Sequence, residues 1–377
     1  MVRVGVIGGG QLARMMIPAA LNLGIELRVF AESAGSSAAM AATYVGDYAN
    51  LEELTSFAHN CDVITFDHEH VPIAHLEALC ADGVRVYPPP GALALTHDKI
   101  VMRRALQHLG VAQPRWTVIE SSTHRDQALR EVGGFPCVAK LPVGGYDGKG
   151  VRVIASWAEA EEWFALGPVL LEEQVDFRRE LAQLGARRPS GEWVAWPVVE
   201  TRQVNGVCSE VLAPAPGMSA EGARQAESIA STIASAINVV GVLAVELFET
   251  ADGRILVNEL AMRPHNSGHV FTELSLTSQF EQHLRAVADF PLGAPELVQE
   301  FGVMANVFGR LDGQLAKLAA EEFPAVKIHD YQKAPRLGRK VGHCVAVGGS
   351  AENTLSAALA ARAILEGDNY DGQRGSS

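Results

Sequence analysis

The sequence contains no long hydrophobic run. Its 377 residues are 48% hydrophobic, yet no stretch approaches the ~18 apolar residues that a membrane-spanning helix requires. The opening residues, MVRVGVIGGG, lack the basic segment, longer apolar run and cleavage site of a secretory signal peptide. We therefore expect a cytoplasmic protein that does not associate with membranes.

Cysteine and positive charge are also scarce. The five cysteines include no CxxC pair, and their odd number argues against a disulfide framework. Lys and Arg number 31 against 44 Asp and Glu, which gives a formal net charge of −13. This balance argues against non-specific nucleic-acid binding. The length suggests roughly two or three domains.

Residues 327–343, the basic segment, depart from this acidic background. Only Asp330 opposes the positive charges there. The segment indicates a binding site for a small anion, and the alternative is an ordinary solvated basic face. Its cationic residues are Lys327, Lys333, Arg336, Arg339 and Lys340.

The first hundred residues alternate between apolar runs and helical patterns. We expect a helix at 11–24 and strands at 2–7, 25–30, 62–66 and 84–87. Strands separated by helices indicate βαβ units and a parallel sheet. The first domain should span residues 1–96.

Three further regions follow this domain. We expect a helix at 98–109, strands at 136–141 and 151–154, and a helix at 158–164. The expected division of the chain is a small domain at 97–171, a larger mixed domain at 172–293, a C-terminal module at 294–366 and a frayed tail at 367–377.

Two glycine-rich segments suggest phosphate binding. Gly8 to Ala13 fit the dinucleotide pattern GxGxxA, and Glu32 follows the second strand where an acid would meet a ribose, so a nicotinamide-dependent oxidoreductase is one hypothesis. Glycines that serve only helix–strand packing are the alternative. The second segment, residues 140–151, lies between two strands and so is not a Walker A loop. A flap over phosphates or a surface hairpin would explain it.

Residues 241–269 read as two strands joined at Asp252-Gly253, the strongest short signal for a two-residue hairpin. That register places Glu246 opposite Glu259. Like charges directly opposite one another destabilise a sheet, so a divalent metal, with Mg²⁺ favoured, is a natural explanation. Two solvated carboxylates are the alternative. A regular strand would turn Asn258 and Glu259 to opposite faces, so a bulge, or a backbone role for Asn258, is needed if both serve the metal site.

Several motifs occur together in a characteristic order. They are GGGQLARM at 8–15, FDHEHVP at 66–72, KLPVGGYDGKG at 140–150, NELAMRPHNSGH at 258–269 and HDYQKAPRLGRKVGH at 329–343. With these motifs the chain resembles the ATP-grasp superfamily and, within it, the N5-carboxyaminoimidazole ribonucleotide synthetase family. The resemblance implies an α/β and α+β multidomain fold: a Rossmann-like N-terminal domain, then an ATP-grasp fold, then a small C-terminal module.

The resemblance also implies a reaction. ATP, with Mg²⁺, phosphorylates bicarbonate to carboxyphosphate, and the amino group of 5-aminoimidazole ribonucleotide takes up the carboxyl group in purine biosynthesis. The family implies a homodimer. The alternatives are another ATP-grasp ligase that activates a different carboxylate such as formate, the oxidoreductase, and a nucleotide sensor without catalysis.

By resemblance, the metal ligands are Glu246 and Glu259. Those implied for ATP are Lys99, Lys140, Gly145, Tyr146, Asp147, Gly148, Lys149, Gly150, Val151, Glu172, Glu173, Gln174, Val175, Glu180, Gln203, Asn258 and Glu259. Those implied for the ribonucleotide are Gly10, Gln11, Leu12, Glu69, Arg263, His265, Asn266, Ser267, Lys333, Arg336, Arg339 and Lys340. Those implied for catalysis are Glu69, Tyr146, Asp147, Lys149, Arg263, His265 and Lys333.

The resemblance leaves the general base open among Glu69, His265 and Lys333. The chain departs from the family at Gln203, where many relatives carry a histidine, and at Ser209, where a basic residue is common. Gln203 can donate and accept hydrogen bonds but cannot become cationic. These two departures therefore bear on the affinity for the nucleotide and not on the reaction chemistry.

Overall fold

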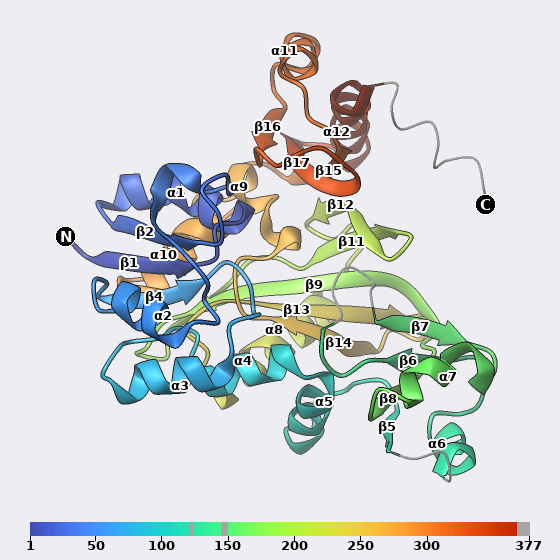
Figure 1. Cartoon of the computed structure of the whole chain (residues 1–377). Coiled ribbons are helices and arrows are strands. Elements are labelled where there is room, and N and C mark those ends of the chain that lie inside the picture. The colour runs from blue at the N-terminus through green and yellow to red at the C-terminus, as the bar shows by residue number, and fades with distance from the viewer. Residues whose placement is uncertain (121–123, 145–149, 368–377) are drawn as a thin grey trace.

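The computed structural model describes residues 1–120, 124–144 and 150–367. It contains three β-sheets with helices packed around them, and Figure 1 shows the N-terminal part at the left of the view and the C-terminal part at the top. Every helix among the described residues is too short or too polar to span a membrane.

The N-terminal sheet is parallel throughout, as predicted, with the order β3-β2-β1-β4. Its strands are β1 (Arg3–Ile7), β2 (Glu26–Ala31), β3 (Ala42–Val45) and β4 (Val63–Phe66), and its helices are α1 (Gln11–Leu23), α2 (Leu51–Ala58) and α3 (Ile73–Ala81).

The strand predicted at 84–87 is wrong. This run forms only an isolated bridge between Ile64 and Val86. Three consecutive prolines follow it at 88–90 and cannot donate ladder hydrogen bonds, so the apolar run does not extend into a strand.

A second sheet is built from antiparallel pairs in the order β5-β8-β6-β7. The strands predicted at 136–141 and 151–154 are confirmed as the pair β6–β7. The helix predicted at 158–164 begins as a 3₁₀ turn at Trp157–Ala160 before α7. The elements of this region are α4 (Pro90–His97), α5 (Lys99–His108), β5 (Trp116–Ile119), α6 (Arg125–Glu131), β6 (Cys137–Lys140), β7 (Val151–Ile154), α7 (Glu161–Phe164) and β8 (Val169–Glu173).

The largest sheet runs in the order β14-β13-β9-β11-β12-β15-β17-β16, with β10 beside β9. Strand β15 pairs with β12, so the C-terminal strands extend the sheet that carries the predicted hairpin. The strands are β9 (Phe177–Arg187), β10 (Trp193–Ala195), β11 (Val199–Val204), β12 (Val207–Ala213), β13 (Gly241–Thr250), β14 (Ile255–Ala261), β15 (Phe301–Gly309), β16 (Lys327–Asp330) and β17 (Arg336–Gly348). The helices are α8 (Ala220–Ala236), α9 (Phe271–Leu274), α10 (Gln279–Val287), α11 (Gly313–Glu322) and α12 (Ala351–Glu366).

A buried histidine joins the N-terminal sheet to the largest sheet. His283 of α10 accepts the Val242 N–H at Nδ1 (3.1 Å), and its Nε2 lies 2.7 Å from Thr65 Oγ1. Burial lowers the pKa of His283 to about 3, so the ring is neutral at physiological pH. Because Nδ1 accepts, Nε2 carries the proton and donates to Thr65. These two contacts fix the position of β4 relative to β13, and with it the spacing between the two sheets.

Candidate active site

The hairpin β13–β14 places Glu246 opposite Glu259, as predicted, but not through the predicted turn. The Thr250 N–H donates to Arg254 O and the Gly253 N–H donates to Thr250 O, which makes a three-residue loop with Gly253 at φ +81°. This loop shifts the register by one residue at the tip. A β-bulge between Glu246 and Leu247 restores it, so the two errors in the predicted turn and ladder cancel.

The bulge falls at Asn258, where Glu246 pairs with Glu259 while Leu247 already pairs with Val257. A bulge re-aims side chains that regular alternation would separate. Asn258 Oδ1 accepts a hydrogen bond from Lys140 Nζ (3.2 Å), while Glu259 faces a large cavity together with Glu246. One of the two conditions named for Asn258 and Glu259, a bulge, is therefore present.

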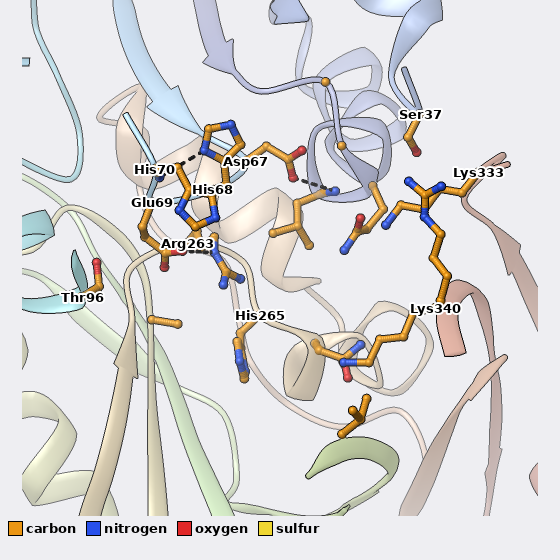
Figure 2. Close-up of a pocket in the computed structure, with 18 of the residues that line it drawn as sticks. Ser37, Asp67, His68, Glu69, His70, Thr96, Arg263, His265, Lys333 and Lys340 are labelled. Carbon is orange, nitrogen blue, oxygen red and sulfur yellow. Dashed lines mark hydrogen bonds and ion pairs between the residues drawn. The ribbon is translucent and has the colours of Figure 1, made fainter. Parts of the chain in front are cut away.

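That cavity has a volume of about 1170 Å³ and is bounded by the N-terminal domain, β13–β14 and the basic segment (Figure 2). Such a volume accommodates a nucleotide-sized ligand. The structure brings together at this cavity most of the predicted substrate and metal residues: Gly10, Gln11, Leu12, Glu69, Lys99, Glu246, Glu259, Arg263, His265, Asn266, Lys333, Arg336, Arg339 and Lys340.

An ion pair and a histidine–carboxylate contact organise one wall of the cavity. Arg263 Nε lies 2.7 Å from Glu69 Oε2, and His265 Nε2 lies 3.2 Å from Glu246 Oε1. Burial raises the pKa of Glu69, but the charge and hydrogen bond of Arg263 outweigh burial and the pKa falls below its ordinary value. The Oγ atom of the buried Ser267 lies 2.8 Å from His265 Nδ1 and orients the imidazole ring. Glu69 is therefore ionised at neutral pH.

The basic segment supplies the facing wall. Figure 2 shows Lys333 and Lys340 across the cavity from Glu69 and Arg263. The segment is docked on the N-terminal domain, because Ser37 Oγ donates to Tyr331 O and Arg14 Nε donates to Asp330 O (3.1 Å). Lys327 lies instead at an exposed position of β16. The cationic side chains that line the cavity are Lys333, Arg336, Arg339 and Lys340.

The glycine turn, Gly8–Gly10, is held by two acids of its own domain. Glu32 accepts the Gly9 N–H (3.0 Å) and pairs with His68 Nε2 (3.1 Å). The His68 hydrogen bond, together with that from Gly9, lowers the pKa of Glu32 to about 2 against the effect of burial. The carboxylate of Glu32, on which the oxidoreductase hypothesis partly depended, thus secures the glycine turn.

Gly10→Ala is expected to destabilise the protein. Asp67 Oδ1 accepts the Leu12 N–H (3.0 Å), and a Cβ at Gly10 would lie 2.0 Å from Asp67 Oδ2. We expect a loss of about 1–3 kcal/mol of unfolding free energy, the usual cost of overpacking, in urea titrations. Gly35→Ala is the control, because a Cβ there meets nothing within 4 Å. Equal stabilities of the two variants would contradict this packing.

The residues predicted for ATP extend beyond the cavity. Lys140 and Glu172 are buried and paired with each other at 2.9 Å, whereas Gln174 is exposed and Val175 half-buried. Glu173 Oε2 lies 2.7 Å from Arg115 Nε in an ion pair. Gly150 and Val151 are half-buried at the start of β7, and Gly145, Tyr146, Asp147, Gly148 and Lys149 lie outside the described residues.

The two departures from the family pattern lie on the hairpin β11–β12. Gln203 is half-buried opposite Cys208. Ser209 is buried and accepts a hydrogen bond from Arg362 Nη1 (2.9 Å) of α12. A cation from another element, Arg362 of α12, thus lies beside Ser209.

Glu180 of β9 has a pKa raised to about 7, because burial and the nearby charge of Glu246 both disfavour its ionised form. The folded state therefore binds this proton more tightly than the unfolded state, and stability falls as pH rises from about 4.5 to 7. Glu180→Gln should remove that loss. We expect its melting temperature at pH 8, measured without ligands, to exceed that of the parent by roughly 2 °C or more, with no gain at pH 5. Identical pH profiles for the two proteins would contradict the assignment.

The donor types at the cavity fit a magnesium–triphosphate group. Glu246 and Glu259 are paired across the ladder and both line the cavity, so they offer carboxylate oxygens, the hard ligands that Mg²⁺ prefers. Lys99 lines the same cavity, and Lys140 lies next to the bulge. Opposing carboxylates beside lysines match what a metal-bound polyphosphate requires.

Comparisons with known proteins agree with this geometry. An ATP-grasp domain model matches residues 104–280, a ribonucleotide synthetase preATP-grasp domain model matches residues 1–97, and a phosphoribosylaminoimidazole carboxylase C-terminal domain model matches residues 302–357. The N5-carboxyaminoimidazole ribonucleotide synthase of Mycobacterium tuberculosis (strain ATCC 25618 / H37Rv) is 47% identical over 99% of this chain and 91% of its own length. The chain belongs to the N5-carboxyaminoimidazole ribonucleotide synthase family.

Other members of the family show the same likeness. The Corynebacterium ammoniagenes synthase is 44% identical over 93% of this chain and 89% of its own length. The crystal structure of an ADP complex of an N5-carboxyaminoimidazole ribonucleotide synthetase has a TM-score of 0.89, with 32% identity and 96% of each chain covered. The Aspergillus clavatus synthase in complex with ADP and 5-aminoimidazole ribonucleotide has a TM-score of 0.87, with 28% identity over 97% of this chain and 98% of that chain. These matches confirm the predicted fold class.

Sequence reasoning missed several residues that shape this family member's site. Asp67 and His68 lie within the FDHEHVP motif without an expected role, yet Asp67 accepts the Leu12 N–H and His68 pairs with the acid that holds the glycine turn. Arg103 was not singled out, although it is fully buried and paired with Glu172 at 2.6 Å. An arginine at a core-facing position of an amphipathic helix is a signal that could have found it, because such charges are buried only when paired.

Proposed function

We propose that this chain catalyses the ATP-dependent carboxylation of 5-aminoimidazole ribonucleotide by bicarbonate. The products are N5-carboxyaminoimidazole ribonucleotide, ADP and phosphate, and the reaction serves purine biosynthesis in the cytoplasm. One observation carries the proposal: a single cavity joins the facing carboxylates Glu246 and Glu259 to the cationic residues of the basic segment. The names of the relatives support the identity of the ribonucleotide.

Binding follows from charge. Glu246 and Glu259 would hold Mg²⁺, which neutralises phosphate charge when bound. Lys99 and Lys140 would meet the triphosphate, as ammonium groups do in other phosphoryl-transfer sites. The dianionic phosphate of the ribonucleotide would lie against Lys333 and its cationic neighbours, which overcome locally the repulsion from a chain of net charge −13. Dimerisation of the chain is part of the proposal by family membership.

The reaction has two stages. A bicarbonate oxygen attacks the γ-phosphorus, the bond to ADP breaks, and carboxyphosphate forms. Its C–O bond then breaks to release phosphate, and the substrate amine forms a C–N bond to the carboxyl carbon while losing a proton. Glu69, kept ionised by Arg263, can accept that proton at Oε1 or Oε2, and His265 and Lys333 are the other candidates.

The proposal is tested by phosphate release from ATP in the presence of bicarbonate, with and without 5-aminoimidazole ribonucleotide. We expect the ribonucleotide to stimulate release at least about tenfold, with carboxylated ribonucleotide formed in equal amount. Formate in place of bicarbonate should not support release. Stimulation by formate would point to another ATP-grasp ligase, and ATP turnover indifferent to the ribonucleotide would overturn the proposal.

A further inference from the structure

Helix α5 carries two cations on one buried face. Lys99 and Arg103 are four residues apart, so both lie on the same side of the helix, together with Met102 and Leu106. Lys99 lines the cavity. Arg103 lies one turn further along, with a side chain that is 0% exposed. A fully buried guanidinium is costly unless it is paired, so its partners indicate what it does.

Arg103 begins a chain of buried contacts that ends beside the metal hairpin. Arg103 Nε lies 2.6 Å from Glu172 Oε1, and Glu172 Oε2 lies 2.9 Å from Lys140 Nζ. Lys140 Nζ then donates to Asn258 Oδ1 (3.2 Å), at the bulge next to Glu259. Arg103 Nη1 also donates to Val257 O (2.9 Å), which ties α5 to the same bulge.

The charges of this network do not cancel. Burial raises the pKa of Glu172, but Arg103 and Lys140 together outweigh burial and bring it to about 2, so the carboxylate is ionised. Lys140 and Glu172 alone would be a neutral pair. With Arg103 included, the three buried groups carry one net positive charge. In a buried site this surplus is screened little and attracts an anion strongly.

We propose that Arg103 is a positioning residue for the triphosphate. Arg103 engages one oxygen of Glu172 and thereby leaves the positive charge of Lys140 uncancelled, and it fixes the other oxygen so that Lys140 Nζ is held at Asn258, next to Glu259. The inference rests on the proposed function only in taking Lys140 as a group that meets phosphate.

The test is the affinity of the full chain for Mg-ADP, measured by calorimetry. Arg103→Met leaves a neutral Lys140–Glu172 pair and should weaken ADP binding at least about tenfold. The double variant Arg103→Met/Glu172→Gln returns the net charge to one, and the amide oxygen that it introduces can still accept a hydrogen bond from Lys140 Nζ. It should bind ADP at least about threefold more tightly than Arg103→Met, whereas Arg103→Lys, which keeps the charge, should stay within about threefold of the parent. Arg104→Met, which removes an exposed arginine from the same helix, is the matched control and should change nothing.

If Arg103 has only a structural role, the ADP affinities of the double variant and of Arg103→Met should rank in the opposite order. The double variant would then bind ADP no better than Arg103→Met, because it loses more native contacts, and this result overturns the inference. If Arg103→Met does not fold, Arg103→Lys decides alone: a loss of ADP affinity greater than about threefold overturns the inference. ADP binding needs no ribonucleotide, so this outcome is separate from that of the phosphate-release assay.

Discussion

Glu246→Gln and Glu259→Gln are each expected to abolish ATP turnover, lowering kcat by about 10³-fold or more. The two carboxylates face each other across the β13–β14 ladder and line one cavity. Amide groups preserve shape but remove the negative charge that would hold Mg²⁺ against the phosphates, an effect of several kcal/mol on the transition state. The assay is phosphate release at saturating ATP, bicarbonate and ribonucleotide.

The fold should survive either change. Removing one of two opposed like charges relieves repulsion, so the melting temperature should stay the same or rise. Glu227→Gln on α8 is the control, since it removes an exposed carboxylate by the same isosteric change and should leave kcat unchanged. Normal turnover in either hairpin variant would remove the metal assignment.

Lys333→Ala is expected to raise the KM for the ribonucleotide about 10- to 100-fold while the KM for ATP changes less than about threefold. Lys333 lines the cavity from the basic segment and faces Arg263 and Glu69 in Figure 2. A charge-assisted contact to a phosphate contributes about 1.5–3 kcal/mol, which corresponds to this range. The measurement is steady-state kinetics with each substrate varied in turn.

Lys327→Ala provides a matched control within the same segment. Lys327 carries the same charge only six residues away but is exposed on β16. Both KM values should stay within about twofold of the parent. Equal effects of Lys333→Ala on ATP and on the ribonucleotide would show that this lysine does not distinguish the two ligands and would contradict the site.

The hairpin illustrates how far sequence reasoning reached. Alternating apolar residues around Asp252-Gly253 predicted the two strands and the Glu246–Glu259 pair, and both are confirmed. The three-residue loop and the bulge were not predicted, because each depends on hydrogen bonds that side-chain patterns do not encode. The requirement for a bulge at Asn258 was nevertheless visible, since period-two alternation cannot present Asn258 and Glu259 to one site.

The charged network around Lys140 could not be predicted in the same way. Arg103 and Glu172 are 69 residues apart, and their contact joins α5 to β8. The same holds for Asp67, which caps the Leu12 N–H from a separate loop. A core-facing arginine could mark Arg103 as buried and paired, but which residue pairs with it follows only from the packing of the folded chain.

The central claim is that ATP phosphorylates bicarbonate in this cavity, and oxygen transfer tests it most directly. With ¹⁸O-labelled bicarbonate, unlabelled ATP and the ribonucleotide, phosphate released during a short incubation is analysed by mass spectrometry. A bicarbonate oxygen that attacks the γ-phosphorus stays with phosphate when the C–O bond breaks. The account predicts one ¹⁸O in each phosphate released, and phosphate without bicarbonate-derived ¹⁸O would contradict it.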